Sequence, residues 1–446
     1  MPKLAPAAAV ALVAAAVRIP GVYTHALWQD EVASARILLE PTLSGAVARV
    51  ARTESTPPLW YVLAWLLHHA GLGIVDVRLL SVAAIGVTAA AACILAQRLA
   101  GDVAGVVAGL LVAFGEQFAV YGESLRAYAL LAMVAALFVL VLLAVVDAPT
   151  PSRLALLALT AASGAYTHYF FALTDVAVVA WLWLEPTLRA VRIRATAAIA
   201  GGSVLVLAWA TELSRQVHNG RTWWIGTFRL RNVLAAPLRL YTFTLNDTGW
   251  GRLLAVVVFV AVCASCAVVA RERTGRLVAA CIFVPMLVAA TAWALGLKVY
   301  ALRNLIEIAP FCAVAFASAA ARLRLPAAAA VVAAGLGAAL VFSELHRVPA
   351  YDDLAHALLR QGWTPAAAIA VEGDPLRFRA PLEWYLPGRP ILVPGDERGR
   401  CASVFLVTRD RVVHLRAVPV GATLLGERGR LPRCVRARPP GHAALA

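Results

Sequence analysis

The chain has 446 residues, of which 61% are hydrophobic and only 15% are charged, and its mean hydropathy is +0.77. Soluble domains are about half apolar and about a quarter charged, so this composition excludes an ordinary soluble protein and indicates a large surface in contact with lipid. The net charge is +15, but the basic residues form short clusters between apolar runs, which is typical of membrane topology and not of a nucleic-acid-binding surface.

Apolar segments long enough to cross a membrane follow one another along most of the chain. A spanning helix needs about 20 apolar residues, and the sequence predicts about eleven such helices. Their approximate bounds are 4–19, 77–97, 103–121, 126–146, 154–168, 170–185, 196–213, 251–270, 277–297, 304–321 and 325–343. We expect the first segment to be a retained span, because no clear small-residue cleavage site follows it.

A further apolar run, 58–75, decides the orientation of everything after it. If this run does not span and the N-terminus is cytoplasmic, every dense arginine cluster of the short loops is cytoplasmic, as the positive-inside rule requires. The clusters contain Arg98, Arg153, Arg189, Arg192, Arg194, Arg271, Arg273, Arg276, Arg322 and Arg324. If the run spans, all of them lie outside. We therefore predict a re-entrant or interfacial helix at 58–75, and the spacing of apolar residues over 43–50 predicts an amphipathic helix on the membrane surface.

This topology leaves three extracytoplasmic regions, at about 20–76, about 214–250 and after about 344. The second region is rich in aromatic residues, which are typical of headgroup-level anchors and can also stack on a sugar or a lipid. The overall fold class is therefore an all-α polytopic membrane protein, with a membrane domain at 1–345 and a further domain at 346–446.

The tail differs in composition from the rest of the chain. It is polar and rich in proline and glycine, with short apolar runs at 366–371 and 404–408 that predict strands, and a helical segment at 351–361. About 100 residues are enough for a small α/β domain, which we expect to be soluble and extracytoplasmic. A disulfide between Cys401 and Cys434 is compatible with that compartment.

Two adjacent carboxylates directly follow the first predicted span. Asp30 and Glu31 belong to the sequence Trp-Gln-Asp-Glu at a predicted membrane surface, where partial burial of charge is costly and therefore indicates a function. Such a carboxylate can act as a general base or hold a divalent cation. The alternative is an ordinary helix start, because acidic residues favour the first turn.

Other charged residues mark the next extracytoplasmic turns. Glu123, Arg126 and Tyr128 lie on one turn, where Arg and aromatic residues can also serve as headgroup anchors, and His168 lies on another, as a ligand, a proton carrier or a hydrogen-bonded turn residue. Lys298 and Arg303 oppose the inside-only bias of basic residues, which makes them candidates for binding a phosphate. Arg303 and Glu307 have the spacing of an ion pair on one helix face, and Asp175 is expected inside the bundle with a partner that the sequence does not identify.

The order of these motifs resembles the glycosyltransferase C superfamily, and specifically family 39 with its bacterial relatives, which include protein O-mannosyltransferases and aminoarabinose transferases. Six segments over about residues 1–345 carry the resemblance. They are Trp28–Glu31, Glu54–Tyr61, Arg78–Ser81, Tyr121–Leu130, Thr167–Phe170 and Arg303–Pro310. The chain departs from the family pattern at Thr56, where a His usually precedes the paired prolines, at Glu123-Ser124, where Gln-Glu is usual, and at Asn304, where an aromatic residue is common.

The resemblance implies an inverting transferase that takes a sugar from a polyprenyl-phosphate donor. Asp30 would then activate an acceptor hydroxyl directly or through a divalent metal, with Asp30 and His168 as candidate metal ligands. Lys298, Arg303 and Arg126 would stabilise the departing phosphate, and Glu54, Glu123, Tyr128 and His168 would complete the substrate site. The implied sugar is mannose or another hexose or pentose, and the acceptor is a protein, a lipid or a cell-wall glycan.

The implied location is the bacterial plasma membrane, with the site on the extracytoplasmic face. Two other functions remain open at this stage. A transporter or lipid flippase would require broken helices and charges at the bilayer midplane, whereas most charges here lie near the ends of predicted spans. A non-catalytic scaffold of the same fold is the second alternative, because the acid near Arg126 is displaced by one position.

Overall fold

The computed structural model describes residues 4–218, 225–242, 249–325, 327, 332, 335, 350–364, 367–372, 375–388, 392–394, 404–407, 411–415 and 422–427. Two compact units make up the chain. The helical unit comprises Met1–Val22 and Ile37–Leu345, and the mixed unit comprises Tyr23–Arg36 and His346–Ala446. The sequence gives no sign that Tyr23–Arg36 groups with the tail.

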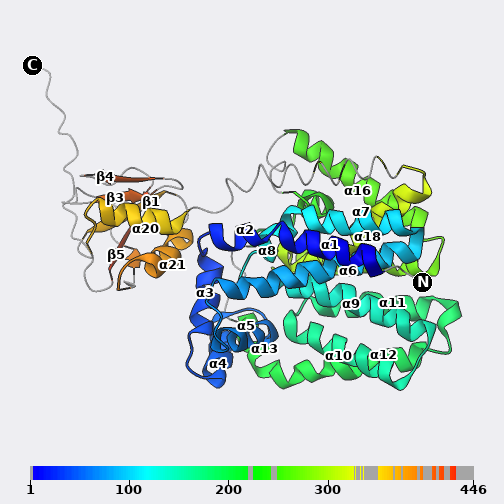
Figure 1. Ribbon diagram of the computed structural model, residues 1–446. Coiled ribbons are helices and arrows are strands. Elements are labelled where there is room, and N and C mark those ends of the chain that lie inside the picture. The colour runs from blue at the N-terminus through cyan, green and yellow to red at the C-terminus, as the bar shows by residue number, and fades with distance from the viewer. Residues whose placement is uncertain are drawn as a thin grey trace, which may run out of the picture. The chain divides into compact units, whose positions relative to one another are not determined.

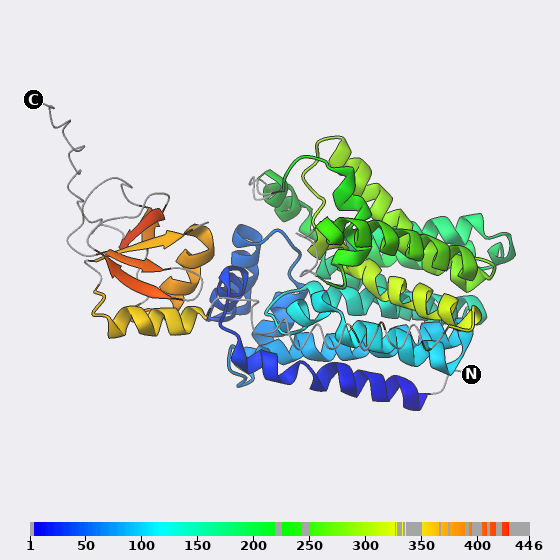
Figure 2. The same ribbon diagram turned by 90° about the horizontal axis from the view of Figure 1, so that it is seen from above.

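The helical unit is a bundle of apolar helices (Figures 1 and 2). Its longer helices are α1 (Leu4–Ala16), α6 (Leu79–Ala100), α7 (Asp102–Phe114), α9 (Tyr128–Asp147), α10 (Pro151–Thr167), α11 (Phe171–Leu184), α12 (Arg192–Ser203), α16 (Gly249–Val269), α17 (Arg273–Ala294) and α18 (Ala309–Arg322). Helices α1, α6, α7 and α18 pack side by side. Helix α9 packs on α6 and on α10, and α10 packs on α12. The all-α membrane fold expected from the sequence is confirmed.

Shorter helical segments complete the unit. They are α2 (Ile19–Thr24), α4 (Leu43–Thr53), α5 (Leu59–His69), η1 (Asp76–Arg78), α8 (Glu116–Gly122), η2 (Pro186–Leu188), η3 (Val204–Trp209), α13 (Ala210–His218), α14 (Leu230–Leu234), α15 (Ala236–Arg239) and η4 (Leu302–Ile308). Helix α5 has 11 residues, which corresponds to about 16 Å at 1.5 Å per residue and is too short for a bilayer core of about 30 Å. Helix α4 begins at Leu43 and buries Ala46 and Val50, as its amphipathic pattern predicts.

Among the described residues, seven helical stretches are long and apolar enough to cross a membrane, or eight if a bent pair counts as one span. Ten of the predicted spans fall on helices of the structure, including α10 and α11, which are shorter than the other spans. The eleventh predicted span, 325–343, lies outside the residues described as continuous structure, as do Cys401 and Cys434.

A sharp bend interrupts one predicted span. Helices α7 and α8 meet at an angle of 58° around Gly115. Such a break frees backbone carbonyls in a place without water, so other donors must satisfy them. Arg18 is fully buried and supplies these donors, because its guanidinium bonds to the carbonyl oxygens of Ala113 at 2.7 Å, Phe118 at 3.0 Å and Val112 at 3.4 Å.

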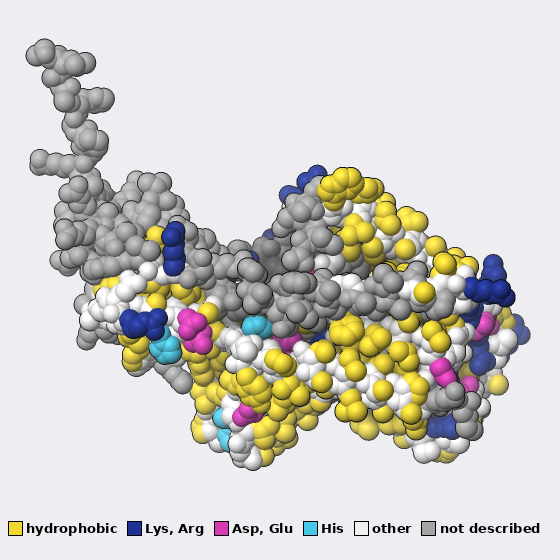
Figure 3. Space-filling model, turned by 45° about the horizontal axis from the view of Figure 1, so that its top comes forward, with side chains coloured by type: hydrophobic (Ala, Val, Ile, Leu, Met, Phe, Trp, Pro, Cys, Tyr) yellow, Lys and Arg dark blue, Asp and Glu magenta, His cyan; other side chains and the backbone are white. Residues whose placement is uncertain are grey.

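The loops predicted to be cytoplasmic meet at one end of the bundle. Arg98 at the end of α6 and Arg273 at the start of α17 both approach Asp147, at 3.1 and 3.9 Å. Arg322 at the end of α18 pairs with Glu272 at 2.5 Å. Figure 3 shows apolar side chains over the visible flank of the helical unit and charged side chains gathered toward an end. The basic clusters that defined the predicted topology therefore share one end of the structure.

The mixed unit contains a five-stranded sheet with the strand order β2-β5-β1-β3-β4. The strands are β1 (Ala368–Glu372), β2 (Leu392–Pro394), β3 (Val404–Val407), β4 (Val412–Leu415) and β5 (Ala422–Glu427). Strands β1 and β3 are parallel, with Ala368 opposite Val404, and the other pairs are antiparallel. Helices α20 (Tyr351–Arg360) and α21 (Pro375–Tyr385) pack on this sheet, and α3 (Gln29–Leu38) begins in the same unit. The helix and the two strands predicted in the tail are present.

Candidate functional site

Two loops of the helical unit are joined by a buried ion pair. Arg126 Nη1 donates to Glu54 Oε2 at 2.9 Å, and the hydroxyl of Tyr61 donates to the same oxygen at 2.8 Å. Burial raises the pKa of Tyr61 well above its ordinary value, so Tyr61 is a neutral donor to this carboxylate. Thr56, which stands where the family has a His, lies next to the Tyr61 hydroxyl at 3.5 Å. The fold thus brings together two of the segments that carried the resemblance.

A second arginine also lies close to Tyr128. The guanidinium carbons of Arg126 and Arg303 each lie 5.9 Å from the centre of the Tyr128 ring. The His168 ring lies 5.7 Å from the same centre. Arg126, Tyr128 and His168 are buried and Arg303 is half-buried. Glu54 is bonded to Arg126, so a carboxylate and two guanidinium groups lie close together here.

His168 is neutral in this surrounding. Burial, with help from the positive charges of Arg126 and Arg303, lowers the pKa of His168 to about 3. Its Nδ1 accepts a hydrogen bond from the backbone N–H of Phe170 at 3.2 Å, so the proton of the neutral ring lies on Nε2. His168 is therefore a fixed hydrogen-bond donor beside the arginines and not a proton carrier at neutral pH.

The remaining predicted residues of the helical unit lie on other segments. Glu123 is buried against α2, where a Cβ on Gly21 would come within 2.1 Å of its Oε2. Lys298 is exposed on the loop between α17 and η4. Asp175 has the partner that the sequence left unidentified, because Ser203 Oγ donates to its Oδ2 at 2.7 Å.

The ion pair expected between Arg303 and Glu307 is wrong. These residues lie on η4, a 3-10 helix, in which positions four apart do not stack as they do on an α-helix. Glu307 is fully buried, and no ion pair joins it to Arg303 among the described residues. Arg303 instead lies over Tyr128, which places its charge with that of Arg126.

Asp30 and Glu31 belong to the mixed unit, in the first turn of α3. Glu31 is buried, and its Oε2 accepts from the backbone N–H of Trp28 at 3.3 Å. This is the acidic half of a capping box, since Trp28 precedes the helix and Glu31 is its third residue. Asp30 is half-buried, with its side chain in the same turn. The adjacent carboxylates therefore differ in role, because Glu31 caps the helix that carries Asp30.

The donor set around His168 does not fit a divalent metal. Among the described residues, no three His, Cys, Asp or Glu side chains lie together as a metal-ligand set. The positive charges of Arg126 and Arg303 lower the pKa of His168 and would repel a cation there in the same way.

The sequence did not predict the hydrogen bonds that connect the turn containing His168 to α4. Tyr169 donates to Gln216 Oε1 at 2.6 Å, and Trp209 Nε1 donates to the Tyr169 hydroxyl at 3.0 Å. Gln216 in turn donates to the carbonyl of Val50 on α4 at 3.4 Å. These bonds fix the turn of His168 to the surface helix that precedes Glu54. The available signal in the sequence was the change from apolar to polar residues at and just after the end of the apolar segment 196–213.

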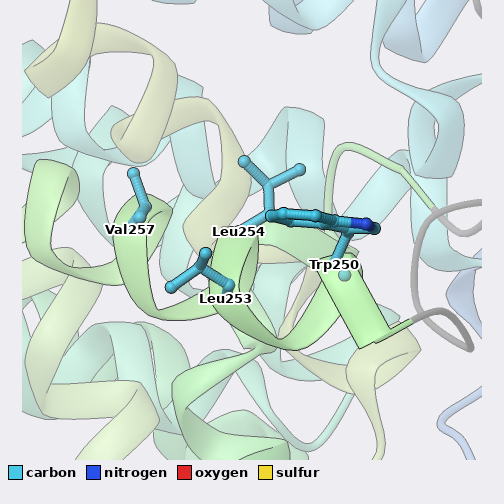
Figure 4. Close-up of a pocket in the computed structure, with 5 residues that line it drawn as sticks. Trp250, Leu253, Leu254 and Val257 are labelled. Atoms are coloured by element: carbon cyan, nitrogen blue, oxygen red, sulfur yellow. The ribbon is translucent and has the colours of Figure 1, made fainter.

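A pocket elsewhere in the helical unit has none of these properties. It is lined by Trp250, Gly251, Leu253, Leu254 and Val257, all on α16 (Figure 4). Trp250, Leu253 and Val257 are exposed apolar side chains on a predicted span. This surface is what a lipid-facing helix presents, and it offers no group for proton transfer or phosphate binding.

No protein-family model and no curated protein sequence matches the chain. Its structure is similar to that of ArnT from Cupriavidus metallidurans bound to undecaprenyl phosphate, with a TM-score of 0.53 and 15% identity, over 85% of this chain and 84% of ArnT. The apo structure of the same ArnT gives a TM-score of 0.52 and 14% identity, over 84% and 83% of the two chains. At these identities the similarity concerns the fold.

Proposed function

From the glycosyltransferase C fold of this chain, we propose that the protein is a membrane glycosyltransferase that takes a sugar from a polyprenyl-phosphate donor. The observation that carries the proposal is the pair of guanidinium groups of Arg126 and Arg303, each 5.9 Å from the centre of the Tyr128 ring. Buried arginines bind phosphate through strong, charge-assisted hydrogen bonds. The similar ArnT structure contains undecaprenyl phosphate, which supports a lipid phosphate as the anion for this chain too.

The proposal assigns Asp30 the role of the base and Arg126 and Arg303 the role of binding the phosphate. Asp30 accepts the proton of an acceptor hydroxyl, and the hydroxyl oxygen attacks the anomeric carbon of the sugar while the bond from that carbon to the phosphate oxygen breaks. The transition state resembles an oxocarbenium ion, and negative charge grows on the departing lipid phosphate. Arg126 and Arg303 stabilise that charge, and a single displacement of this kind inverts the anomeric configuration.

The supporting residues have distinct tasks in this proposal. Glu54 orients Arg126 and keeps the local charge from becoming too positive for folding. Neutral His168 donates from Nε2 to a phosphate or sugar oxygen without adding charge. Lys298, exposed on the adjacent loop, attracts the anionic headgroup, and Glu123 takes part in substrate binding. The site faces the extracytoplasmic side of a bacterial plasma membrane, where the acceptor is a protein, a lipid or a glycan.

The experiment that tests this function identifies the bound lipid. Asp30→Asn should bind the donor without turning it over, so mass spectrometry of lipids that co-purify with this variant should detect a polyprenyl-phosphate sugar and identify the sugar. Asp353→Asn is a matched control, because Asp353 is also in the first turn of a helix of the mixed unit and is exposed. This control should retain wild-type transfer of the identified sugar.

The opposite result would be bulk phospholipid only, together with no binding of added polyprenyl-phosphate sugars. That result would contradict the proposal and favour a transporter or a scaffold. Equal transfer by Asp30→Asn and the wild type would leave the donor class in place but remove Asp30 as the base.

A further inference from the structure

The segment that carries Asp30 is packed into the core of the mixed unit. Ala26 is buried in the same apolar cluster as Tyr351 of α20 and Leu382 of α21, and Trp28 packs against that cluster. The backbone N–H of Leu27 donates to the hydroxyl of Tyr385 at 2.7 Å, across 358 positions of sequence. Tyr385 and the apolar side chains of α20 and α21 therefore hold the chain where it enters α3.

A second anchor holds the other side of the segment. Arg36 Nη2 donates to Glu383 Oε2 at 3.0 Å. Glu383 is itself buried, and the backbone N–H of Leu392 holds its Oε1 at 3.0 Å without help from a side chain. Arg379 Nε donates to the same oxygen at 2.9 Å from a partly exposed position. Leu392 begins β2, which pairs with β5 in the sheet. The Arg36 anchor is thus connected through Glu383 to the sheet.

The two anchors bracket Asp30. Leu27 lies three positions before it and Arg36 six positions after it, and Glu31 caps the helix between them. We propose that the C-terminal residues of the mixed unit are a positioning device for glycosyl transfer, in which Tyr385 and Glu383 hold α3 so that the Asp30 carboxylate has a fixed orientation. This inference rests on the proposed function, because it takes Asp30 as the base.

A base must lie in a narrow range of distance and direction to accept a proton in the transition state. A displacement of about 1 Å by a distant change can lower a rate about 100-fold. Tyr385 and Glu383 touch the segment and not the reacting atoms, so their loss should lower kcat and leave the affinity for the donor phosphate, which Arg126 and Arg303 bind, close to the wild-type value. A general loss of folding would instead reduce both.

The chain offers a matched pair of variants for this test. Arg36 and Arg379 form one ion pair each with Glu383, at 3.0 and 2.9 Å, and their side chains are 39% and 34% exposed. Only Arg36 belongs to the segment that carries Asp30. We expect Arg36→Gln to lower kcat about tenfold or more with little change in donor affinity, Arg36→Lys to restore most of it, and Arg379→Gln to transfer at the wild-type rate.

Hydrogen–deuterium exchange of the full-length protein tests the anchors without requiring transfer. The peptide containing Leu27 should exchange faster in Tyr385→Phe and Arg36→Gln than in the wild type, and at the wild-type rate in Arg379→Gln. Unchanged exchange in both test variants would overturn the anchoring. Faster exchange with unchanged kcat would overturn the positioning role and leave the proposed function intact. A wild-type protein that transfers no sugar from any polyprenyl-phosphate donor would overturn the proposed function itself, and the positioning role with it.

Discussion

Arg126 and Glu54 are 72 positions apart in sequence, yet their side chains meet at 2.9 Å with only 9% and 5% of their surfaces exposed. Both charges are almost completely removed from solvent, so each needs partners within the fold. The pair holds Arg126 beside Tyr128, where Arg303 supplies the second cation. A structural contact and a proposed phosphate-binding group therefore share one guanidinium.

The two roles of Arg126 can be separated by a double variant. Arg126→Gln leaves Glu54 buried without this partner, and we expect a loss of about 3–5 kcal/mol in the free energy of unfolding together with loss of donor binding. Arg126→Gln with Glu54→Gln removes both charges and should recover most of the stability. Donor binding should stay lost, because the phosphate still lacks its cation. Thermal unfolding in detergent and a binding assay with a polyprenyl-phosphate sugar measure the two effects, and recovery of binding in the double variant would contradict the phosphate role.

The low pKa of His168 predicts a pH dependence of stability with a definite sign. The pKa is about 3 in the folded protein, against about 6.5 for an unperturbed His, so the unfolded chain takes up a proton first as the pH falls. The contribution of His168 to stability is therefore complete above about pH 6.5 and decreases below it by about 1.4 kcal/mol per pH unit until about pH 3.

The variant that checks this dependence is His168→Gln, which keeps a hydrogen-bonding side chain but cannot titrate. Between pH 6.5 and pH 5, unfolding measurements should show a loss for the wild type that exceeds the loss for the variant by about 2 kcal/mol. At pH 7 and above the difference between the two proteins should be constant. Parallel pH curves down to pH 5 would show that His168 is not buried as a neutral ring.

Local sequence patterns predicted the helices and part of the candidate site. The apolar runs predicted the spans because a bilayer imposes a length on every helix that crosses it. Arginine clusters predicted which loops share an end, and the ion pairs of Asp147 with Arg98 and Arg273 place them there. Arg126, Tyr128, His168 and Arg303 were each predicted from their position on a turn, and the fold brings these four residues together.

Contacts between distant segments could not be predicted in the same way. The docking of Leu27 on Tyr385 joins positions 358 apart, and no periodicity records such a pairing. The helix type of η4 also depends on tertiary packing, and it decides that Arg303 lies over Tyr128 and not next to Glu307. The role of Arg18 could not be predicted from the sequence, because the bend that it supports forms only when α7 and α8 fold.

Glu123 can be displaced without being replaced. A Cβ on Gly21 would come within 2.1 Å of Glu123 Oε2, so Gly21→Ala should force the buried carboxylate to move. If Glu123 contributes to substrate binding, the donor or acceptor KM should rise several-fold. Gly201→Ala is the control, because Gly201 is also helical and a Cβ there meets nothing within 4 Å. A wild-type KM in both variants would remove Glu123 from the site.

Arg18 should contribute more to stability than arginines at the ends of the bundle. Its guanidinium satisfies the carbonyls of Ala113 and Phe118 at the bend between α7 and α8, and each buried acceptor left without a donor costs about 1–3 kcal/mol. We therefore expect Arg18→Met to lower the free energy of unfolding by several kcal/mol, and Arg18→Lys by less, because one ammonium reaches fewer carbonyls.

The comparison for Arg18 is Arg153, which donates to two carbonyls, those of Ala144 at 2.8 Å and Ala148 at 3.2 Å, from a half-buried position in the first turn of α10. Water can replace these donors, so Arg153→Met should cost only about 1 kcal/mol. Chemical unfolding in one detergent measures both variants. Equal losses would mean that the carbonyls at the bend have another source of hydrogen bonds. A larger loss for Arg18→Met would show that the bend, and with it the position of the turn that carries Glu123 and Arg126, depends on a charge within the first span.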